Sequence, residues 1–183
     1  MLEQIQLFDW KVLAWIQDVF CCDFMDFIMP KITALRNAGI IWILAGIALL
    51  FSKKYRKSGI FLLVGLLLGL LTGNLILKNL VARARPCWLD PLFPLLIENP
   101  EDYSFPSGHT LSSVIAAVSL AKTDRRFGYI AVPLAVLIAF SRLYLYVHFP
   151  TDVLAAAVLG IGIAFLTFYV GNKVFEKTLQ DRT

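Results

Sequence analysis

The only two histidines of this 183-residue chain each lie in a polar motif within an otherwise apolar sequence. His109 ends a Pro-Ser-Gly-His motif, and His148 stands between Ser141-Arg142 and Asp152 in the pattern Ser-Arg-x5-His-x3-Asp. Imidazole is the side chain best suited to nucleophilic and acid–base chemistry near neutral pH. The two motifs therefore indicate covalent or acid–base catalysis.

Three cations accompany the histidines. Lys78 and Arg85 belong to a third motif, Lys-x6-Arg-Pro, and Arg142 lies six residues before His148. A phosphoryl group in transfer spreads negative charge over three oxygens, so its catalysis depends mainly on positioning and charge stabilisation. Arginine binds such oxygens through a planar fork, and lysine acts as a compact charge. The three motifs together indicate phosphoryl transfer.

The Pro-Ser-Gly-His motif opens a predicted helix. We expect the backbone N–H groups of Ser107 and Gly108, and the Ser107 hydroxyl, to face the phosphate at this helix N-terminus. Gly108 also permits close approach of the backbone.

His148 is the candidate nucleophile because Asp152 follows it by four residues, in the first turn of a helix predicted to start at Pro150. The Asp152 carboxylate is expected to accept the Nδ1–H of His148 and to leave Nε2 free to attack phosphorus. His109 would protonate the leaving oxygen and then act as base toward the water that hydrolyses the phosphohistidine. A purely structural hydrogen bond between His148 and Asp152 is the alternative interpretation.

The apolar runs that carry these motifs are long enough to cross a bilayer, which takes about 20 mostly apolar residues. A hydrophobic share of 58% and a mean hydropathy of +0.72 exceed what a soluble domain needs. The sequence predicts an all-α fold, a polytopic transmembrane helical bundle that forms one domain over residues 1–183. The five predicted spans are residues 33–51, 59–77, 107–122, 128–147 and 151–170.

Two of these spans have unusual features. Arg36 and Asn37 interrupt the first, and the third is short for a bilayer, so its N-terminal end with His109 should lie slightly below the membrane surface.

Residues 1–22 place apolar side chains at helical spacing, with polar ones between them. This pattern predicts an amphipathic helix. It either lies in the membrane interface or packs against the bundle.

The positions of lysine and arginine predict the orientation. Cations gather in residues 52–58, in residues 122–127 and in the C-terminal tail, and the positive-inside bias places these segments in the cytoplasm. The three motifs, residues 78–152, then converge on the extracytoplasmic face. The net charge of +4 thus reflects topology, and no nucleic-acid partner is expected.

The loop of residues 86–106 contains four prolines, which argue against a regular element. It is either a substrate-gating lid or a solvated connector. Arg83, which belongs to no motif, is a candidate contact for a lipid head group or the substrate.

The order, spacing and identity of the motifs resemble those of the type 2 phosphatidic acid phosphatase superfamily of integral membrane lipid phosphatases. The resemblance covers residues 78–152 and every signature position is matched. It implies the same roles for His148, His109 and Asp152, and it implies that no metal or other cofactor is required. The residues that it implies for phosphate binding are Lys78, Arg85, Ser107, Gly108 and Arg142.

The resemblance implies a metal-independent lipid phosphatase of the bacterial inner membrane that acts at the outer face. Its substrate would have a phosphate or diphosphate head group and chains lying between helices. Lipid A 1-phosphate and undecaprenyl diphosphate are favoured because their head groups are presented on that face. Phosphatidylglycerophosphate and phosphatidate remain alternatives, as do a lipid phosphotransferase and a non-catalytic lipid transporter or scaffold.

Overall fold

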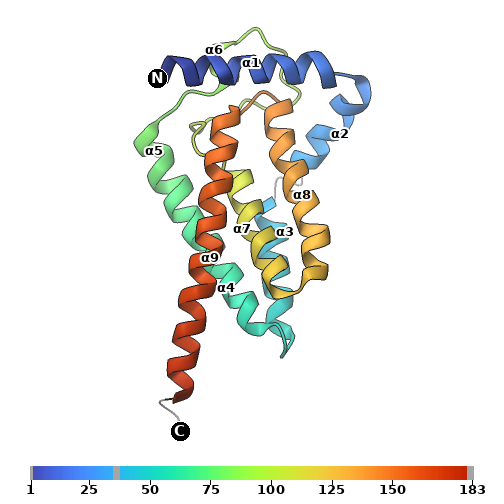
Figure 1. Ribbon diagram of the computed structural model, residues 1–183. Coiled ribbons are helices and arrows are strands. Elements are labelled where there is room, and N and C mark those ends of the chain that lie inside the picture. The colour runs from blue at the N-terminus through green and yellow to red at the C-terminus, as the bar shows by residue number, and fades with distance from the viewer. Residues whose placement is uncertain (1, 35–37, 181–183) are drawn as a thin grey trace.

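The computed structural model describes residues 2–34 and 38–180, and these residues form helices and connecting segments without strands (Figure 1). The predicted all-α fold is confirmed. The helices are α1 (Leu2–Phe20), α2 (Asp23–Ala34), α3 (Ala38–Phe51), α4 (Arg56–Gly69), the π-helix η1 (Leu70–Leu77), α5 (Lys78–Val81), α6 (Pro86–Leu89), α7 (Gly108–Thr123), α8 (Arg125–Tyr144) and α9 (Pro150–Gln180).

Helix α7 is the centre of the bundle and packs against α3, α4, α8 and α9. Its buried residues Ala116 and Ala117 share a core with Leu62 of α4 and with Ala135 and Ile138 of α8. Small side chains let helix backbones approach closely, which suits association in lipid. The start of α7, with His109, is therefore held among several helices.

Within the described residues, three helical segments are long and apolar enough to cross a membrane. They contain the second and fifth predicted spans and residues 128–144 of the fourth. Helices α2 and α3, inclined at 50°, supply a fourth if they act as one broken span. Helix α7 forms where the third span is predicted, but it has only 16 residues. The total of five spans stays a prediction, and the predicted interruption at Arg36 and Asn37 lies outside the described residues.

Helix α1 lies across one end of the bundle, roughly at right angles to the long helices (Figure 1). It packs against α8 and α9, with Leu13 and Ile16 buried, while Leu7, Phe8 and Trp15 remain exposed. The structure thus shows the packed arrangement, and the exposed apolar side chains also suit a position in the interface.

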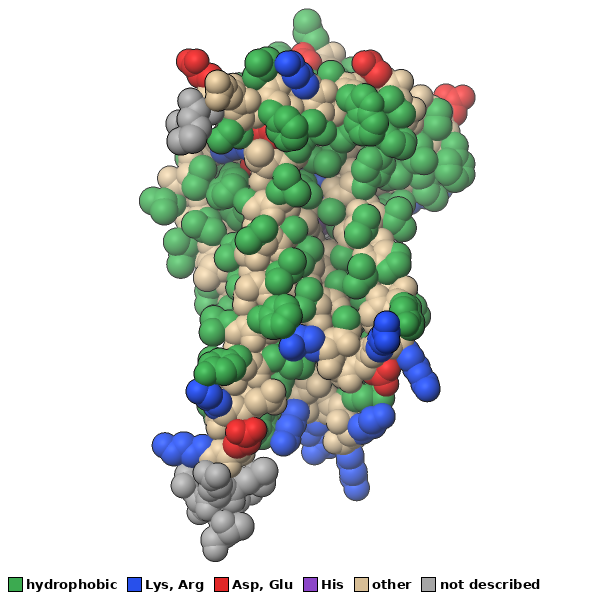
Figure 2. Space-filling model, in the orientation of Figure 1, with side chains coloured by type: hydrophobic (Ala, Val, Ile, Leu, Met, Phe, Trp, Pro, Cys, Tyr) green, Lys and Arg blue, Asp and Glu red, His purple; other side chains and the backbone are tan. Residues whose placement is uncertain are grey.

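The motif-bearing segments all lie at the end of the bundle that α1 covers: α5, the start of α7, the end of α8 and the start of α9 (Figure 1). Lysine and arginine side chains gather at the opposite end (Figure 2). The exposed cations of that end are Lys53, Lys54, Arg56, Lys57, Lys122, Arg125, Arg126, Lys173 and Lys177. The two ends of the bundle therefore differ in charge as the sequence predicts.

The loop of residues 86–106 is folded against the bundle. Contrary to expectation, it begins with the short helix α6, which has Pro86 at its first position, where a missing N–H costs nothing. The ring of Phe93 stacks on Tyr146 with centroids 3.9 Å apart, and Trp88 Nε1 donates to the Pro100 carbonyl at 3.0 Å. These contacts do not fit a solvated connector.

Candidate active site

Side chains from all three motifs line one cavity of about 750 Å³ at the α1-covered end of the bundle. Lys78 opens α5, Arg85 immediately precedes α6, and Arg142 lies in the last turn of α8. His109 is in the first turn of α7 and His148 is in the turn between α8 and α9. Segments far apart in the sequence thus form a single polar site.

The hydrogen bonds of His148 define which ring nitrogen can react. Arg85 Nη1 lies 3.2 Å from Nε2, and a guanidinium group can only donate. Nε2 is therefore the acceptor, and the proton belongs on Nδ1, which lies 3.3 Å from Ser104 Oγ. Ser104 in turn donates to Asp152 Oδ2 at 2.5 Å. This relay leaves a lone pair on Nε2, inside the cavity.

The expected direct hydrogen bond between His148 and Asp152 is absent, because Nδ1 and Oδ2 are 3.8 Å apart and Ser104 lies between them. Asp152 Oδ2 instead also accepts the Phe149 N–H at 2.9 Å, as a carboxylate in the first turn of α9 commonly does. Ser104 is fully buried and belongs to none of the motifs, so spacing alone does not reveal it.

The surroundings of His148 favour its neutral form. Burial, followed by the charges of Arg85 and Arg142, lowers the pKa of His148 well below the ordinary value of 6.5. A nucleophilic imidazole must be neutral, so this side chain is prepared for attack at neutral pH.

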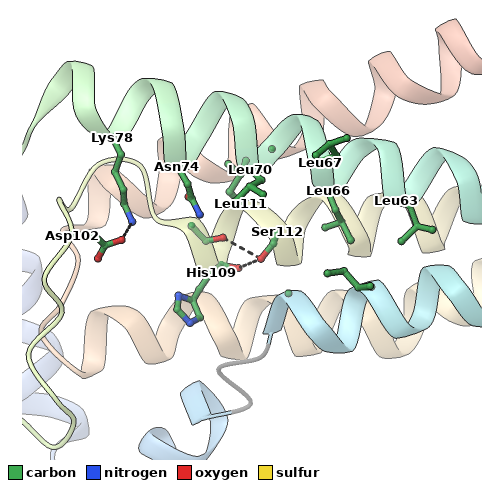
Figure 3. Close-up of a pocket in the computed structure, with 14 residues that line it drawn as sticks. Leu63, Leu66, Leu67, Leu70, Asn74, Lys78, Asp102, His109, Leu111 and Ser112 are labelled. Atoms are coloured by element: carbon green, nitrogen blue, oxygen red, sulfur yellow. Dashed lines mark hydrogen bonds and ion pairs between the residues drawn. The ribbon is translucent and has the colours of Figure 1, made fainter.

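A second cavity, of about 510 Å³, adjoins the polar one between α3, α4, η1 and α7 (Figure 3). Its apolar walls include Ile43, Leu63, Leu66, Leu67, Leu70 and Leu111. Lys78, Asp102 and His109 line both cavities. The polar cavity thus adjoins an apolar groove, and His109 stands at their junction.

Two side chains at this junction have buried polar atoms without a hydrogen-bond partner in the described part of the chain, His109 Nε2 and Asn74 Oδ1. Figure 3 shows both pointing into the same space. Buried polar atoms are nearly always paired, so such atoms often mark a place where a ligand binds. Asn74 lies in the π-helix η1, a distortion that is frequent at functional sites.

Gly108 is needed for close packing at this junction. A Cβ atom on Gly108 would lie 2.7 Å from Asn74 Oδ1, so a larger residue would displace Asn74. The expected close approach at Gly108 is therefore to the neighbouring helix.

Ser107 does not face the polar cavity as expected. Its N–H donates to the backbone carbonyl of Asp152 at 3.3 Å, its hydroxyl accepts from Thr110 at 3.0 Å, and it is fully buried. The reason is that the Pro-Ser-Gly-His segment packs directly on the start of α9. Ser107 joins two motifs to each other.

Asp102, in the loop of residues 86–106, pairs with two of the cations that line the polar cavity. It forms ion pairs with Lys78 and, at 2.6 Å, with Arg85 Nη2. Partial burial would raise the pKa of Asp102, but the hydrogen bond and charge of Lys78, together with Arg85, lower it to about 2. The third cation, Arg142, donates to Thr33 Oγ1. The motifs give no sign of Asp102, because it lies in a segment of irregular structure.

Arg83 is not exposed toward head groups as expected. Its guanidinium lies between Asp9 of α1 and Asp152, 2.6 Å from each carboxylate. Within residues 2–34 and 38–180, no three His, Cys, Asp or Glu side chains are grouped so as to hold a metal ion. Independence of metal stays a prediction.

The sequence profile of the PAP2 superfamily matches residues 58–176, which contain all three motifs. The chain belongs to the PAP2 superfamily. Its fold is similar to that of two solved superfamily structures. The Bacillus subtilis phosphatidylglycerolphosphate phosphatase gives a TM-score of 0.69 at 26% identity over 93% of this chain and 96% of the other. LpxE of Aquifex aeolicus gives a TM-score of 0.73 at 25% identity, over 87% and 93% of the two chains.

Curated PAP2 relatives include an undecaprenyl-diphosphatase of Sulfolobus acidocaldarius, 37% identical over 71% of this chain and 63% of the relative's length. Undecaprenyl-diphosphatase BcrC of Bacillus subtilis is 30% identical over 79% of this chain and 74% of its own. The match thus spans less than two thirds of the first relative. Together with the apolar helices, these similarities identify a multi-pass membrane protein.

Proposed function

We propose that this protein is a lipid phosphatase that removes phosphate from a lipid phosphate or diphosphate through a phosphohistidine at His148. One observation carries the proposal: the polar cavity and the apolar groove meet at His109. A lipid phosphate has the same arrangement, since its anionic head is joined to its chain through the oxygen that must leave.

The geometry suggests how such a substrate would bind. The terminal phosphate would lie among Lys78, Arg85 and Arg142, and the chain would lie in the groove. His109 would then stand beside the leaving oxygen. His148 lines the polar cavity and not the groove, so that its Nε2 would approach phosphorus from the side away from the chain. Attack opposite the leaving group is what in-line phosphoryl transfer requires.

The reaction would proceed in two balanced steps. In the first, His148 Nε2 forms a bond to phosphorus, the bond to the lipid oxygen breaks, and His109 gives that oxygen a proton. In the second, His109 takes a proton from water, and the water oxygen displaces Nε2 to release phosphate. Ser104 and Asp152 would hold the Nδ1 proton throughout and stabilise positive charge on the ring.

Undecaprenyl diphosphate is the substrate that we propose first. The groove walls are mainly leucine, which suits a long hydrocarbon chain, and two curated relatives are named undecaprenyl-diphosphatases. Lipid A 1-phosphate is the second candidate, as the superfamily resemblance implies, and a curated relative that is 26% identical is named lipid A 4'-phosphatase. We place the site at the outer face of the bacterial inner membrane, since the exposed cations gather at the opposite end of the bundle.

The test is phosphate release by purified protein in the presence of a chelator. The panel is undecaprenyl diphosphate, lipid A 1-phosphate, phosphatidylglycerophosphate and phosphatidate, with His148→Ala as the control. We expect turnover of the first, and site mapping under alkaline conditions, in which phosphohistidine is stable, should find phosphate on His148. Lipid binding without turnover would instead favour a transporter or scaffold, and transfer to an added alcohol would favour a phosphotransferase.

A further inference from the structure

A buried ionic cluster lies behind the polar cavity and joins α1 to the start of α9. Asp9 and Asp152 are both fully buried, and Arg83 bridges them. Arg83 Nη2 donates to Asp9 Oδ2 and Nη1 donates to Asp152 Oδ1, each at 2.6 Å. Neither Asp9 nor Arg83 lines the polar cavity or the groove.

Hydrogen bonds from neighbouring groups fix both sides of this bridge. Thr151 donates to Asp9 from its backbone N–H at 3.0 Å and from its hydroxyl at 2.6 Å. Gln6 Oε1 accepts from Arg83 Nη2 at 2.9 Å, and the guanidinium lies over the Phe149 ring at 4.2 Å. A planar guanidinium with this many partners has one well-defined orientation.

The charges of the cluster depend on one another. Two buried carboxylates share one cation. Without Arg83, Oδ1 of Asp152 would lose its partner and face the like charge of Asp9, so the carboxylate would rotate away from Asp9. Its Oδ2 would then leave the position in which it accepts the Ser104 hydroxyl and the Phe149 N–H. The relay that orients His148 would then be lost.

We infer that Arg83 and Asp9 are positioning residues for the nucleophile. Asp9 holds Arg83, Arg83 holds the Asp152 carboxylate in its orientation, and Asp152 acts on His148 through Ser104. Helix α1 is thus part of the catalytic apparatus although it contributes no side chain to the cavity. The inference rests on the function proposed above, and it concerns residues for which that proposal has no role.

The test compares Arg83→Ala, Asp9→Asn and the double variant with the wild type, on undecaprenyl diphosphate. Asp18→Asn is the matched control, because Asp18 is exposed on the same helix. Arg83→Ala should lower kcat by about 10- to 100-fold, as loss of an orienting partner typically does, with little change in KM.

The double variant separates this role from a general loss of structure. Asp9→Asn removes the like charge that faces Asp152 once Arg83 is absent, so Arg83→Ala/Asp9→Asn should be no less active than Arg83→Ala. The inference would be overturned if the two substitutions lower kcat by factors that multiply in the double variant, or if Arg83→Ala raises KM at unchanged kcat. If Arg83→Ala does not fold, Asp9→Asn alone decides, and kcat equal to that of Asp18→Asn overturns it. Wild-type protein without turnover would refute the proposed function itself.

Discussion

At the level of single residues, the reactivity of His148 depends on which of its nitrogens has the proton. Arg85 can only donate to Nε2 of His148, so Nε2 has the lone pair and is the nitrogen that would attack phosphorus. Burial and the neighbouring cations lower the pKa of His148, so that the ring stays neutral even below pH 6.5. The charges that would bind phosphate therefore also favour the neutral form of the proposed nucleophile.

Ser104→Ala should reduce kcat by about tenfold or more, because Nδ1 of His148 loses its acceptor and Asp152 is 3.8 Å away. The measurement is the rate of phosphoenzyme formation in a single turnover, with Ser119→Ala as the control. Ser119 is equally buried but lines neither cavity. Wild-type rates in Ser104→Ala would show that Asp152 orients the ring directly.

His109→Ala should impair poor leaving groups far more than good ones. His109 lies at the junction of the two cavities, where the leaving oxygen would be, and a good leaving group needs little protonation. The measurement is kcat/KM for an aryl phosphate and for an alkyl phosphate. The same loss on both substrates would argue against a general-acid role.

The motifs identify the residues that meet in the cavity, because order and spacing place their helix ends at one side of the bundle. They do not identify how those residues are connected. Ser104, Asp102 and Arg83 lie in segments without periodicity, where partners are set by the path of the chain in space. For the same reason the sequence does not reveal that Ser107 bonds to Asp152 and Thr110, or that Ser104 lies between His148 and Asp152.

At the level of elements, Asp102 in the loop of residues 86–106 pairs with Lys78 and Arg85 and would compete with the phosphate of the proposed substrate for them. Asp102→Asn should lower the inhibition constant of inorganic phosphate by about two- to fivefold, the range expected for ion pairs that are partly exposed. Because its pKa is about 2, Asp102 is charged throughout the neutral range, so the gain should not depend on pH there.

Asp90→Asn is the control for this loop variant, since Asp90 accepts only a long bond from Tyr146 at 3.4 Å and lines neither cavity. Weaker phosphate binding in Asp102→Asn would mean that the carboxylate serves to hold Lys78 and Arg85 in place.

The helices themselves are the most predictable elements, because long apolar runs leave few alternatives to a membrane helix. The π-helix η1 and the short helix α6 have no such signal. Asn74 of η1 lies close to Gly108 of α7, which is a contact between segments that are distant in the sequence. Helix α1, across the bundle end, is likewise joined to a distant segment by the ion pair of Asp9 with Arg83.

At the level of the whole molecule, charge is distributed along the bundle axis. One end presents many exposed lysine and arginine side chains (Figure 2). At the other end Lys78, Arg85 and Arg142 are buried around the cavity, while Lys11 of α1 is exposed. Cytoplasmic segments of membrane proteins are enriched in lysine and arginine. This asymmetry predicts that the cavity opens outside the cytoplasm, where outer-leaflet lipids would reach it.

Labelling of single cysteines tests the orientation directly. Cys21 and Cys22 are exposed at the α1–α2 junction and Cys87 is buried, so all three must first be replaced. Leu92→Cys lies in the loop, at a position 92% exposed, and should react with a membrane-impermeant thiol reagent in intact spheroplasts. Lys53→Cys, exposed at the opposite end, should react only after permeabilisation. The reverse pattern would turn the cavity toward the cytoplasm, and lipids confined to the outer leaflet would no longer be candidate substrates.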